Sequence, residues 1–407
     1  LFAAETNPSP ENPVLAPASD AGSNPRPEVE PPPQPSPADS FLQSMAHLIG
    51  VVEERFHGLP DWEKVYDGAA AGFVRALGDR HTEYLTPAEH AAWIAEQNGE
   101  QANVGLVLRA RRNGPMEILA VLPGTPAAEA GLQRGDRIVA VDGRSVTDDW
   151  FDGKPFLSGE LGSKLSLKVV RASEPERDVE LTRRNVHRPV GFAKRLRGGI
   201  GYLHLREFRG IGEEEFELLN TLLEGEPLKG LVLDLRFNPG GTMRSAANLA
   251  ALFLEPRTRI LGLHYRHKPD ESVSVDHGGE LRELPLVILL NGHSASASEV
   301  LAGALQDHGR ARVIGTRSRG KGSSQSVYPL TRGAVKLTVA LWSTPNGRRI
   351  QRQESGEGGI LPDVVVNADD NEGLPLANRL LLGSAGLPDK DRRPDPALRA
   401  ALAALKP

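Results

Sequence analysis

Short apolar segments alternate with amphipathic helical segments from Val186 onward, and this alternation constrains the fold more than any other feature. The apolar segments include Leu231–Leu235 and Leu284–Leu290, and helical periodicity follows them over Met243–Leu254 and Ser298–His308. Strands that alternate with helices pair in parallel, with the helices covering the faces of the sheet. The pattern therefore predicts an α/β fold with a parallel sheet.

Changes in composition divide the chain into five predicted parts. Residues 1–40 hold 11 of the 32 prolines and few periodic apolar residues, so we expect a disordered leader. Helical periodicity marks residues 41–100, and β-branched runs with Gly-rich turns mark residues 101–186. The α/β alternation extends over residues 187–376, and residues 377–407 form a tail that ends in an Ala/Leu helix, Pro396–Leu405.

The segment Gly124–Gly143 combines a short helix, which ends at Gly131, with two glycine-containing turns. It closely resembles a PDZ domain of the bacterial, protease-associated type. The resemblance implies that a peptide adds as a strand beside the first strand of the domain, where backbone amides hold its terminal carboxylate. The corresponding substrate-binding residues are Val104, Gly105, Leu106 and Val107. The alternative is that Gly105 only relieves a bend at the start of a strand.

The first segment with chemical potential is Asn238-Pro239-Gly240-Gly241, which follows the buried strand Leu231–Leu233. A turn with two glycines at a strand end can direct its amides into a cleft, as an oxyanion hole requires. An ordinary strand-to-helix turn explains this segment equally well.

The second segment places three serines, Ser294, Ser296 and Ser298, between an apolar strand and a helix. A serine at such a junction gains from the positive end of the helix dipole, although Ser298 also fits a simple N-cap. Gly292–Ser296 is a near match to the G-x-S-x-G elbow, which would make Ser294 the nucleophile with a histidine such as His293 as base.

The third segment, Gly315–Gly322, almost matches a phosphate-binding loop, G-x-x-x-x-G-K-[ST]. Gly322 stands where a magnesium-binding hydroxyl is needed, and the residues that follow are strand-like rather than helical. Nucleotide binding is therefore a minor alternative.

The three segments follow a PDZ-like module in an order that resembles the C-terminal processing peptidases, also called tail-specific proteases. The resemblance extends from Phe41 to Asp369. It implies a crotonase-like α/β protease core with an inserted, β-rich PDZ domain and flanking N- and C-terminal helices that often mediate dimers. By motif position it implies catalytic Ser296, Lys321 and Gln325, and an oxyanion hole formed by Ala297 with Gly241 or Gly240.

The residue types fit that chemistry. A serine hydroxyl needs a neighbouring base, and lysine can act as one only when it is neutral. Burial without a counter-ion lowers the pKa of a lysine toward working pH. Gly320 and Gly322 allow close packing around Lys321, and the neutral amide of Gln325 can orient the amine without stabilising its charged form.

The chain departs from the family pattern at three positions. Phe237 stands where Asn is common, and Arg319 stands where Phe is common. Ser158 stands where many members have an Arg, which in some of them couples peptide binding to activation. The last departure leaves the activation mechanism open.

Composition excludes several classes of function. The formal net charge of −5 gives no basic excess for nucleic-acid binding, and the lack of cysteine removes thiol catalysis and Cys-ligated zinc. His264 and His267 are expected to face opposite sides of a strand, so we expect no metal site and no cofactor. No apolar run has the length of a transmembrane span.

The sequence analysis thus predicts a serine endopeptidase that recognises substrate C-terminal tails through its PDZ domain and cleaves by a Ser–Lys mechanism. Two alternatives remain: a catalytically silent PDZ scaffold, and a Ser–His hydrolase that uses Ser294. We expect proteins or peptides with accessible C-termini as partners, a homo-oligomer, and room for an adaptor or activator protein. The chain begins with Leu1 rather than Met, so we expect an exported protein of the bacterial envelope, located in the periplasm, whose signal segment has been removed.

Overall fold

The computed structural model describes residues 36–97, 102–111, 114–146, 157–172, 174–186, 189–367 and 395–405. The chain forms two compact units, residues 1–65 and residues 66–407. Most of the predicted leader and the tail segment 377–394 lie outside the described residues. The first helix begins at Pro37, inside the predicted leader.

The first unit contains the helix α1 (Pro37–Arg55) and the start of α2 (Trp62–Arg75). Ser36 and Asp39 form a capping box that begins α1: the serine hydroxyl accepts the Asp39 amide, and the carboxylate accepts the Ser36 amide. The helix has no buried residue, and its apolar side chains Phe41 and Leu48 are exposed. A subunit contact through the N-terminal helices stays a prediction.

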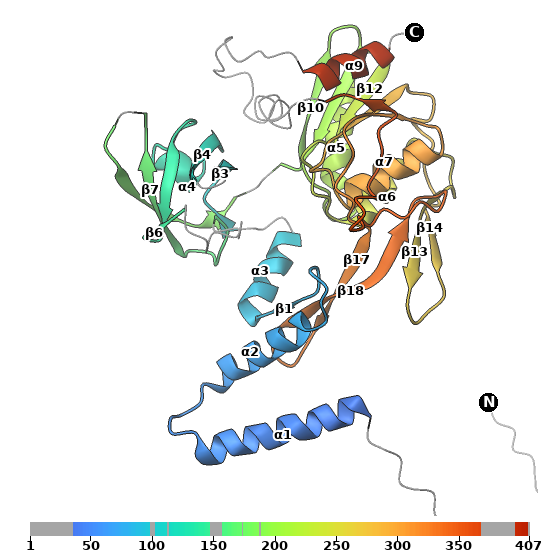
Figure 1. Ribbon diagram of the computed structural model, residues 1–407. Helices are drawn as coiled ribbons and strands as arrows, with labels where there is room; N and C mark the ends of the chain where they lie inside the picture. Colours follow the sequence, from blue (N-terminus) through green and yellow to red (C-terminus); the bar gives the residue numbers. More distant parts are fainter. Residues whose placement is uncertain are drawn as a thin grey trace, which may run out of the picture. The chain divides into compact units, whose positions relative to one another are not determined.

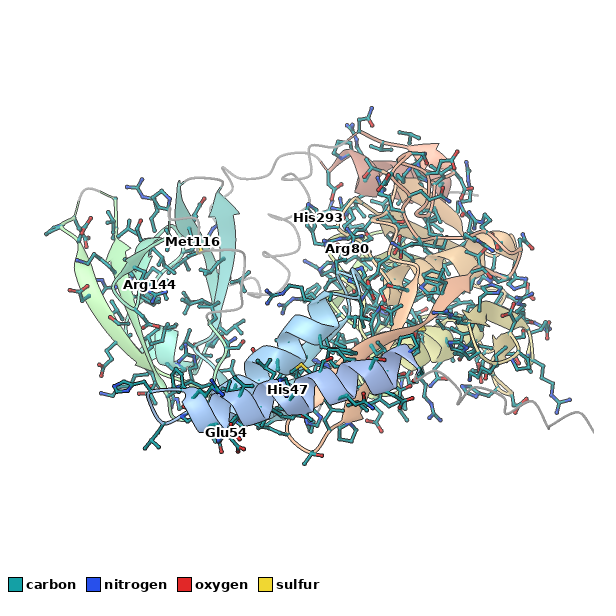
Figure 2. The ribbon with its side chains drawn as sticks, turned by 60° about the horizontal axis from the view of Figure 1, so that its bottom comes forward. His47, Glu54, Arg80, Met116, Arg144 and His293 are labelled. Carbon is teal, nitrogen blue, oxygen red and sulfur yellow. The ribbon has the colours of Figure 1, made fainter. Side chains whose placement is uncertain are left out.

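A β-rich domain occupies residues 102–186 (Figure 1). Its sheet has the strand order β3-β4-β5-β7-β8, with β6 paired to β5. The strands are β3 (Leu106–Arg111), β4 (Gly114–Val121), β5 (Arg137–Val141), β6 (Arg144–Ser145), β7 (Lys164–Val170) and β8 (Arg177–Thr182). The helix α4 (Pro126–Glu129) packs against this sheet, and Met116 lies within its core (Figure 2). The short strands β2 (Ala102–Asn103) and β9 (Arg184–Asn185) pair with each other, so the two ends of the domain lie side by side.

The second half of the chain forms the predicted sheet. Its strand order is β10-β11-β12-β15-β16-β19. The strands are β10 (Gly191–Leu196), β11 (Ile200–Leu205), β12 (Gly230–Asp234), β15 (Leu286–Leu290), β16 (Arg312–Gly315) and β19 (Val364–Val365). The strands from β11 to β19 are parallel, and β10 adds an antiparallel edge. Every residue of β12 and β15 is buried, as expected for parallel strands covered on both faces.

The two faces of this sheet carry different helices, as Figure 1 shows. Leu231 and Leu233 pack with α5 (Glu213–Leu223), α6 (Met243–Ala251) and α7 (Ala297–Asp307) in the larger core cluster. Val232, which points to the other face, packs with α9 (Pro396–Ala404). The alternation of side chains along each strand thus builds a three-layer core.

A second sheet joins distant parts of the chain. Its order is β1-β18-β13-β14, with β17 also paired to β18. The strands are β1 (Glu83–Leu85), β13 (Arg259–Tyr265), β14 (Glu271–Ser274), β17 (Ser323–Pro329) and β18 (Ala334–Ser343). The strand β1 precedes the β-rich domain and is followed by the helix α3 (Pro87–Gln97). The β-rich domain is therefore an insertion between elements of one core, and the predicted α/β fold class is confirmed.

Candidate active site

Ser296 lies directly before α7, at the carboxyl end of β15. Its backbone has φ 55° and ψ −116°, in a region that non-glycine residues rarely adopt. The serine is the N-cap of α7, which begins at Ala297. If Ser298 were the N-cap, the helix would begin two residues later. Ser298 instead lies in the first turn and donates its hydroxyl to the Asn238 carbonyl at 3.0 Å.

The carboxylate of Glu299 holds the strained residue in place. Glu299 is fully buried, and its Oε2 accepts the Ser296 amide at 2.7 Å. The same oxygen accepts the Lys321 amide at 2.9 Å. The two amide nitrogens therefore lie within two hydrogen-bond lengths of each other, which brings together residues 25 positions apart.

Lys321 lies in the loop between β16 and β17 and is partly buried. Burial lowers the pKa of its amine, and the charges of Lys336 and Arg319 lower it further, while Glu299 opposes them. A lysine in such an environment loses its proton at a lower pH than a solvated lysine does. The neutral amine is the form that can accept a proton.

Gln325 lies on β17 and takes part in a network of hydrogen bonds. Its Nε2 donates to Ser323 Oγ at 2.9 Å and to Thr338 Oγ1 at 3.1 Å. The two side-chain hydrogen bonds of Gln325 are therefore made with neighbouring hydroxyls and not with Lys321. The amide oxygen is the atom left to accept a hydrogen from the amine.

The Asn238–Gly241 turn packs directly against the nucleophile. A Cβ added to Gly240 would lie 2.8 Å from Ser296 Cβ, and both glycines have positive φ, 107° and 132°. The Gly240 amide donates to Asn238 Oδ1 at 2.8 Å. Among the hydrogen bonds of the described residues, none uses the amides of Gly241 or Ala297. This arrangement favours Gly241 over Gly240 as an oxyanion donor.

Asn238 ties this turn to the serine segment. Its carbonyl accepts the Ala295 amide at 3.0 Å and the Ser298 hydroxyl, and its side-chain amide donates to the Leu205 carbonyl at 3.2 Å. The turn and the serine segment are thus held together through one residue.

Ser294 is already used in the interior. It is fully buried, donates its hydroxyl to the Leu235 carbonyl at 2.9 Å and accepts the Asn291 amide at 3.0 Å. The ring of His293 stacks on Phe237, with centroids 5.0 Å apart; Figure 2 marks its position. These contacts disfavour Ser294 as a nucleophile.

The loop that almost matches a phosphate-binding loop already holds an anion of the chain. The Gly320 amide donates to Glu299 Oε1 at 2.6 Å, and the Lys321 amide donates to Oε2. Amides that bind an internal carboxylate are not available to phosphate, which disfavours nucleotide binding. In the described part of the chain, no group of three His, Asp or Glu side chains has a metal-binding arrangement.

In the β-rich domain the residues expected to bind the peptide, Val104–Val107, lie at the start of β3. Here the side chain of Asn103 bonds with the loop: its Oδ1 accepts the amides of Val104 at 2.7 Å and Gly105 at 3.0 Å. Its Nδ2 donates to Ser158 Oγ at 3.1 Å. Gly105 has φ 85°, and a Cβ there would lie 2.2 Å from Thr125 Oγ1, so this glycine serves a close approach. Leu106 is buried and Val107 lies next along β3, opposite Ala120.

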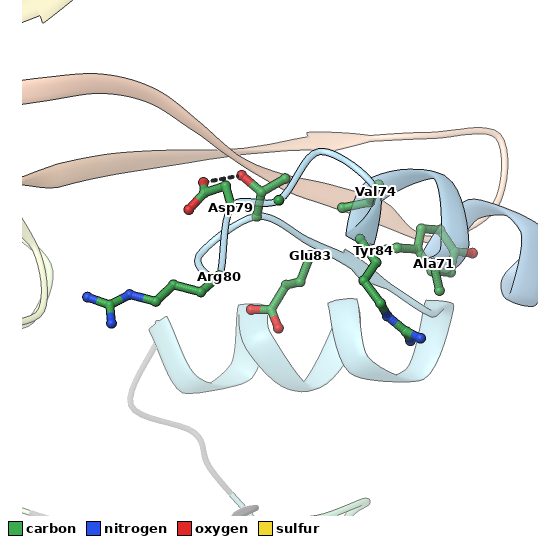
Figure 3. Close-up of a pocket in the computed structure, with 9 residues that line it drawn as sticks. Ala71, Val74, Asp79, Arg80, Glu83 and Tyr84 are labelled. Carbon is green, nitrogen blue, oxygen red and sulfur yellow. Dashed lines mark hydrogen bonds between the residues drawn. The ribbon is translucent and has the colours of Figure 1, made fainter. Parts of the chain in front are cut away.

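Two groups near the site were missed in the sequence analysis. Glu299 stands three residues after Ser296, a capping-box spacing that provided a signal. The other group is the turn between α2 and β1, shown in Figure 3, which borders a pocket of about 430 Å³. Thr82 donates to Asp79 at 2.7 Å and accepts the Thr338 amide at 3.0 Å, so this turn reaches the network of Gln325. Burial lowers the pKa of His81 in the same turn, and the charge of Lys321 lowers it further.

Comparison with known proteins gives two family matches. The model of peptidase family S41 matches residues 199–366, and that of the PDZ domain matches residues 117–171. A carboxy-terminal-processing protease of Bartonella bacilliformis is 34% identical, over 80% of this chain and 75% of the relative. A carboxyl-terminal-processing protease of Synechocystis is 35% identical, over 72% of this chain and 69% of the relative. The solved structure of a photosystem II D1 C-terminal processing protease is 28% identical, with a TM-score of 0.52, and the match covers 80% of this chain and 86% of that one.

Proposed function

Since the chain belongs to peptidase family S41, that of the carboxy-terminal-processing proteases, we propose that this serine protease works through a Ser296–Lys321 pair. The observation that carries the proposal is the shared carboxylate oxygen of Glu299, which holds the backbones of both residues. The lowered pKa of Lys321, caused by burial and by its cationic neighbours, supports a neutral amine as the base.

The mechanism follows from these positions. Ser296 Oγ attacks the carbonyl carbon of the scissile peptide bond, and its proton passes to Lys321 Nζ. The carbonyl oxygen becomes an oxyanion, which the amides of Gly241 and Ala297 stabilise. Lys321 then gives the proton to the departing amine as the C–N bond breaks, and a serine ester remains. Water hydrolyses this ester with Lys321 again acting as base.

We further propose that Gln325 positions the amine of Lys321 through its side-chain oxygen. Its nitrogen is held by the hydroxyls of Ser323 and Thr338, which orients the oxygen. As a neutral group, it can accept a hydrogen from the amine without the charge stabilisation that a carboxylate would add.

Recognition of substrates is proposed to use the PDZ domain. A C-terminal tail would add as a strand beside β3, with its carboxylate at the Val104–Leu106 loop. We also propose an exported protein of the bacterial envelope, located in the periplasm, that acts as a homo-oligomer and leaves room for an activator protein. Among the described residues, no helix has the length and apolarity to cross a membrane.

Hydrolysis of a denatured model protein by the full chain tests the catalytic proposal. We expect Ser296→Ala and Lys321→Ala each to abolish cleavage, while Ser294→Ala retains it in proportion to the folded protein. Loss of activity with Ser294→Ala alone would move the nucleophile to Ser294. Wild-type activity in Ser296→Ala would refute the Ser–Lys mechanism.

Tail recognition is tested with the inactive Ser296→Ala protein. A peptide with a free C-terminal carboxylate should bind more tightly than the same peptide with a C-terminal amide, because only the first carries the charge that the loop amides accept. Equal affinities, measured by calorimetry, would refute this mode of recognition.

A further inference from the structure

Glu299 is a fully buried carboxylate that takes part in none of the proton transfers or bond changes described above. It lies on the first turn of α7 and accepts four hydrogen bonds, two at each oxygen. Oε2 accepts the amides of Ser296 and Lys321, and Oε1 accepts the Gly320 amide at 2.6 Å and the Ser318 hydroxyl at 2.5 Å. A carboxylate is the side chain that accepts at both oxygens and donates at neither.

These four donors come from two separate segments. The Ser296 amide belongs to the strained residue that precedes α7, and the other three donors belong to the loop Ser318–Lys321. No other residue in the described ranges accepts hydrogen bonds from the backbones of both Ser296 and Lys321. Glu299 is therefore the direct mechanical link between the nucleophile and the base.

Ser318 extends this link to a third segment. Its hydroxyl donates to Glu299 and accepts the Ile360 amide at 2.6 Å, and its own amide donates to the Ile360 carbonyl at 3.1 Å. Ser318 and Ile360 are both fully buried. The Gly359–Asp363 segment, for which the mechanism has no other role, thus supports the loop that carries Lys321.

We propose that Glu299 is a positioning residue for catalysis, which sets the separation and orientation of Ser296 and Lys321 by binding both backbones, with Ser318 as its support. This role rests on the proposed Ser–Lys function. The charge of Glu299 also acts on the amine of Lys321, as do the charges of Lys336 from β18 and Arg319 from the loop. The His81 ring, from the turn before β1, is another titratable group that interacts with this amine, and burial and the charge of Lys321 lower its pKa.

Glu299→Gln is the most direct test because it keeps the size of the side chain and replaces one acceptor oxygen with an NH₂ donor. Whichever oxygen it replaces, the NH₂ group points at a backbone N–H, which is also a donor. Two donors repel each other, so the Ser318–Lys321 loop and the first turn of α7 must move apart. We expect kcat for a fluorogenic peptide to fall by about 100-fold while KM stays within about threefold, as for a misplaced catalytic group.

The pH profile provides a readout that a purely structural role would not change. Loss of the negative charge lowers the pKa of Lys321, so the acid limb of kcat/KM should move to lower pH in Glu299→Gln. Wild-type kcat with an unmoved acid limb would overturn the proposal.

Ser318→Ala provides a second variant that keeps three of the four donors and is less disruptive to folding. Ser343→Ala is its matched control, because Ser343 is equally buried and its hydroxyl bonds with His264 Nε2, away from the carboxylate. We expect kcat per folded molecule to fall by about fivefold or more in Ser318→Ala and to stay unchanged in Ser343→Ala. Equal kcat values in the two variants would overturn the supporting role.

Ser296→Ala separates this inference from the proposed function. If Ser296→Ala is inactive and Glu299→Gln keeps the wild-type kcat and pH profile, only the positioning role is refuted. If Ser296→Ala keeps the wild-type kcat, the Ser–Lys function is refuted and the positioning role with it.

Discussion

Lys321 owes its proposed role as a base to the groups around its amine. Burial lowers its pKa most, and the like charge of Lys336 on β18 adds to the effect. Lys336 itself forms an ion pair with Glu83 at 2.9 Å, which helps to hold its side chain in place. The lowered pKa of Lys321 therefore depends on its own loop and on the neighbouring strand β18, and not on the lysine alone.

Lys336→Met should move the acid limb of kcat/KM to higher pH. Removal of a neighbouring positive charge makes protonated Lys321 more favourable, so its pKa rises and the neutral amine forms only at higher pH. Activity below the limb should fall severalfold while the high-pH plateau is retained. Lys164→Met in the PDZ domain, which also removes an ion-paired lysine, is the control and should leave the profile unchanged. A limb that stays in place would contradict this electrostatic coupling.

Asn103 occupies two of the amides that a bound carboxylate would need. Its neutral oxygen is a weaker acceptor than a carboxylate, so the proposed substrate tail would replace it, and the exchange would reduce the net gain in binding free energy. The same side chain also donates to Ser158 Oγ through its Nδ2, so Asn103 links the loop to that residue.

We expect Asn103→Ala, in the inactive Ser296→Ala background, to bind a free-carboxylate peptide about 3- to 10-fold more tightly, because the two loop amides no longer have a competing acceptor. Calorimetric titration measures the change, and the amidated peptide serves as the control, since it does not benefit. Weaker binding of the free-carboxylate peptide would show that Asn103 orders the loop for its ligand rather than competing with it.

Phe237 illustrates how backbone conformation explains a sequence departure. Its φ is 63°, in the left-handed region that Asn tolerates better than other non-glycine residues. This preference fits the Asn that the resemblance to the family would place here. In this chain the aromatic ring stacks on His293, and the Phe237 amide donates to Asn291 Oδ1 at 3.1 Å. These contacts offset the strain of the left-handed backbone.

At the scale of elements, α9 is joined to the sheet by a buried ion-pair network. Arg236 donates to Asp234 and also to both oxygens of Asp395, at 3.1 and 2.8 Å. Asp395 is the N-cap of α9, since it accepts the Leu398 amide at 2.9 Å. Arg236, two residues before the Asn238–Gly241 turn, thus anchors a helix whose N-cap lies 159 positions further along the chain.

Asp395→Ala should lower the free energy of unfolding by about 2–4 kcal/mol, through loss of the N-cap and of hydrogen bonds to a buried guanidinium. Urea unfolding of the full chain measures the change. Asp395→Asn is the matched variant: its remaining oxygen keeps the cap, while the charge and the hydrogen bond at Oδ2 are lost, so its loss should be smaller. Equal losses in the two variants would show that the cap contributes nothing.

At the scale of the whole molecule, the PDZ domain and the protease core have separate interiors. The buried cluster of the PDZ domain shares no residue with the two clusters of the core. The ends of the domain meet where β2 pairs with β9, so the insertion begins and ends at neighbouring strands. This arrangement favours a core that folds without the domain.

Replacement of residues 102–185 by a short Gly-Ser linker should leave a folded core. We expect the shortened chain to react with a serine-directed fluorophosphonate at Ser296 and to lose the preference for substrates with a free C-terminus. Labelling, with the Ser296→Ala form of the shortened chain as control, and competition between tailed and amidated substrates measure the two properties. A shortened chain that unfolds would show that the core depends on the domain.

Much of the fold follows from local patterns. The apolar run at β15 and the helical periodicity of α7 predict their elements, since side-chain spacing alone distinguishes a buried strand from an amphipathic helix. The pairing of β1 with β18 had no such signal, because β1 has only three residues and its partner lies about 250 positions away. Register between such distant strands depends on packing.

The candidate site divides in the same way. The prediction of Ser296 and Lys321 depended on the order of three motifs and on their resemblance to a family, because residue type alone left three serines open at the strand–helix junction. Only the tertiary structure decided that Glu299 joins them and that the Gly240 amide is already used by Asn238. Hydrogen-bond partners of a buried group are selected by the segments that folding brings within about 3 Å, and no periodicity in the chain encodes that distance.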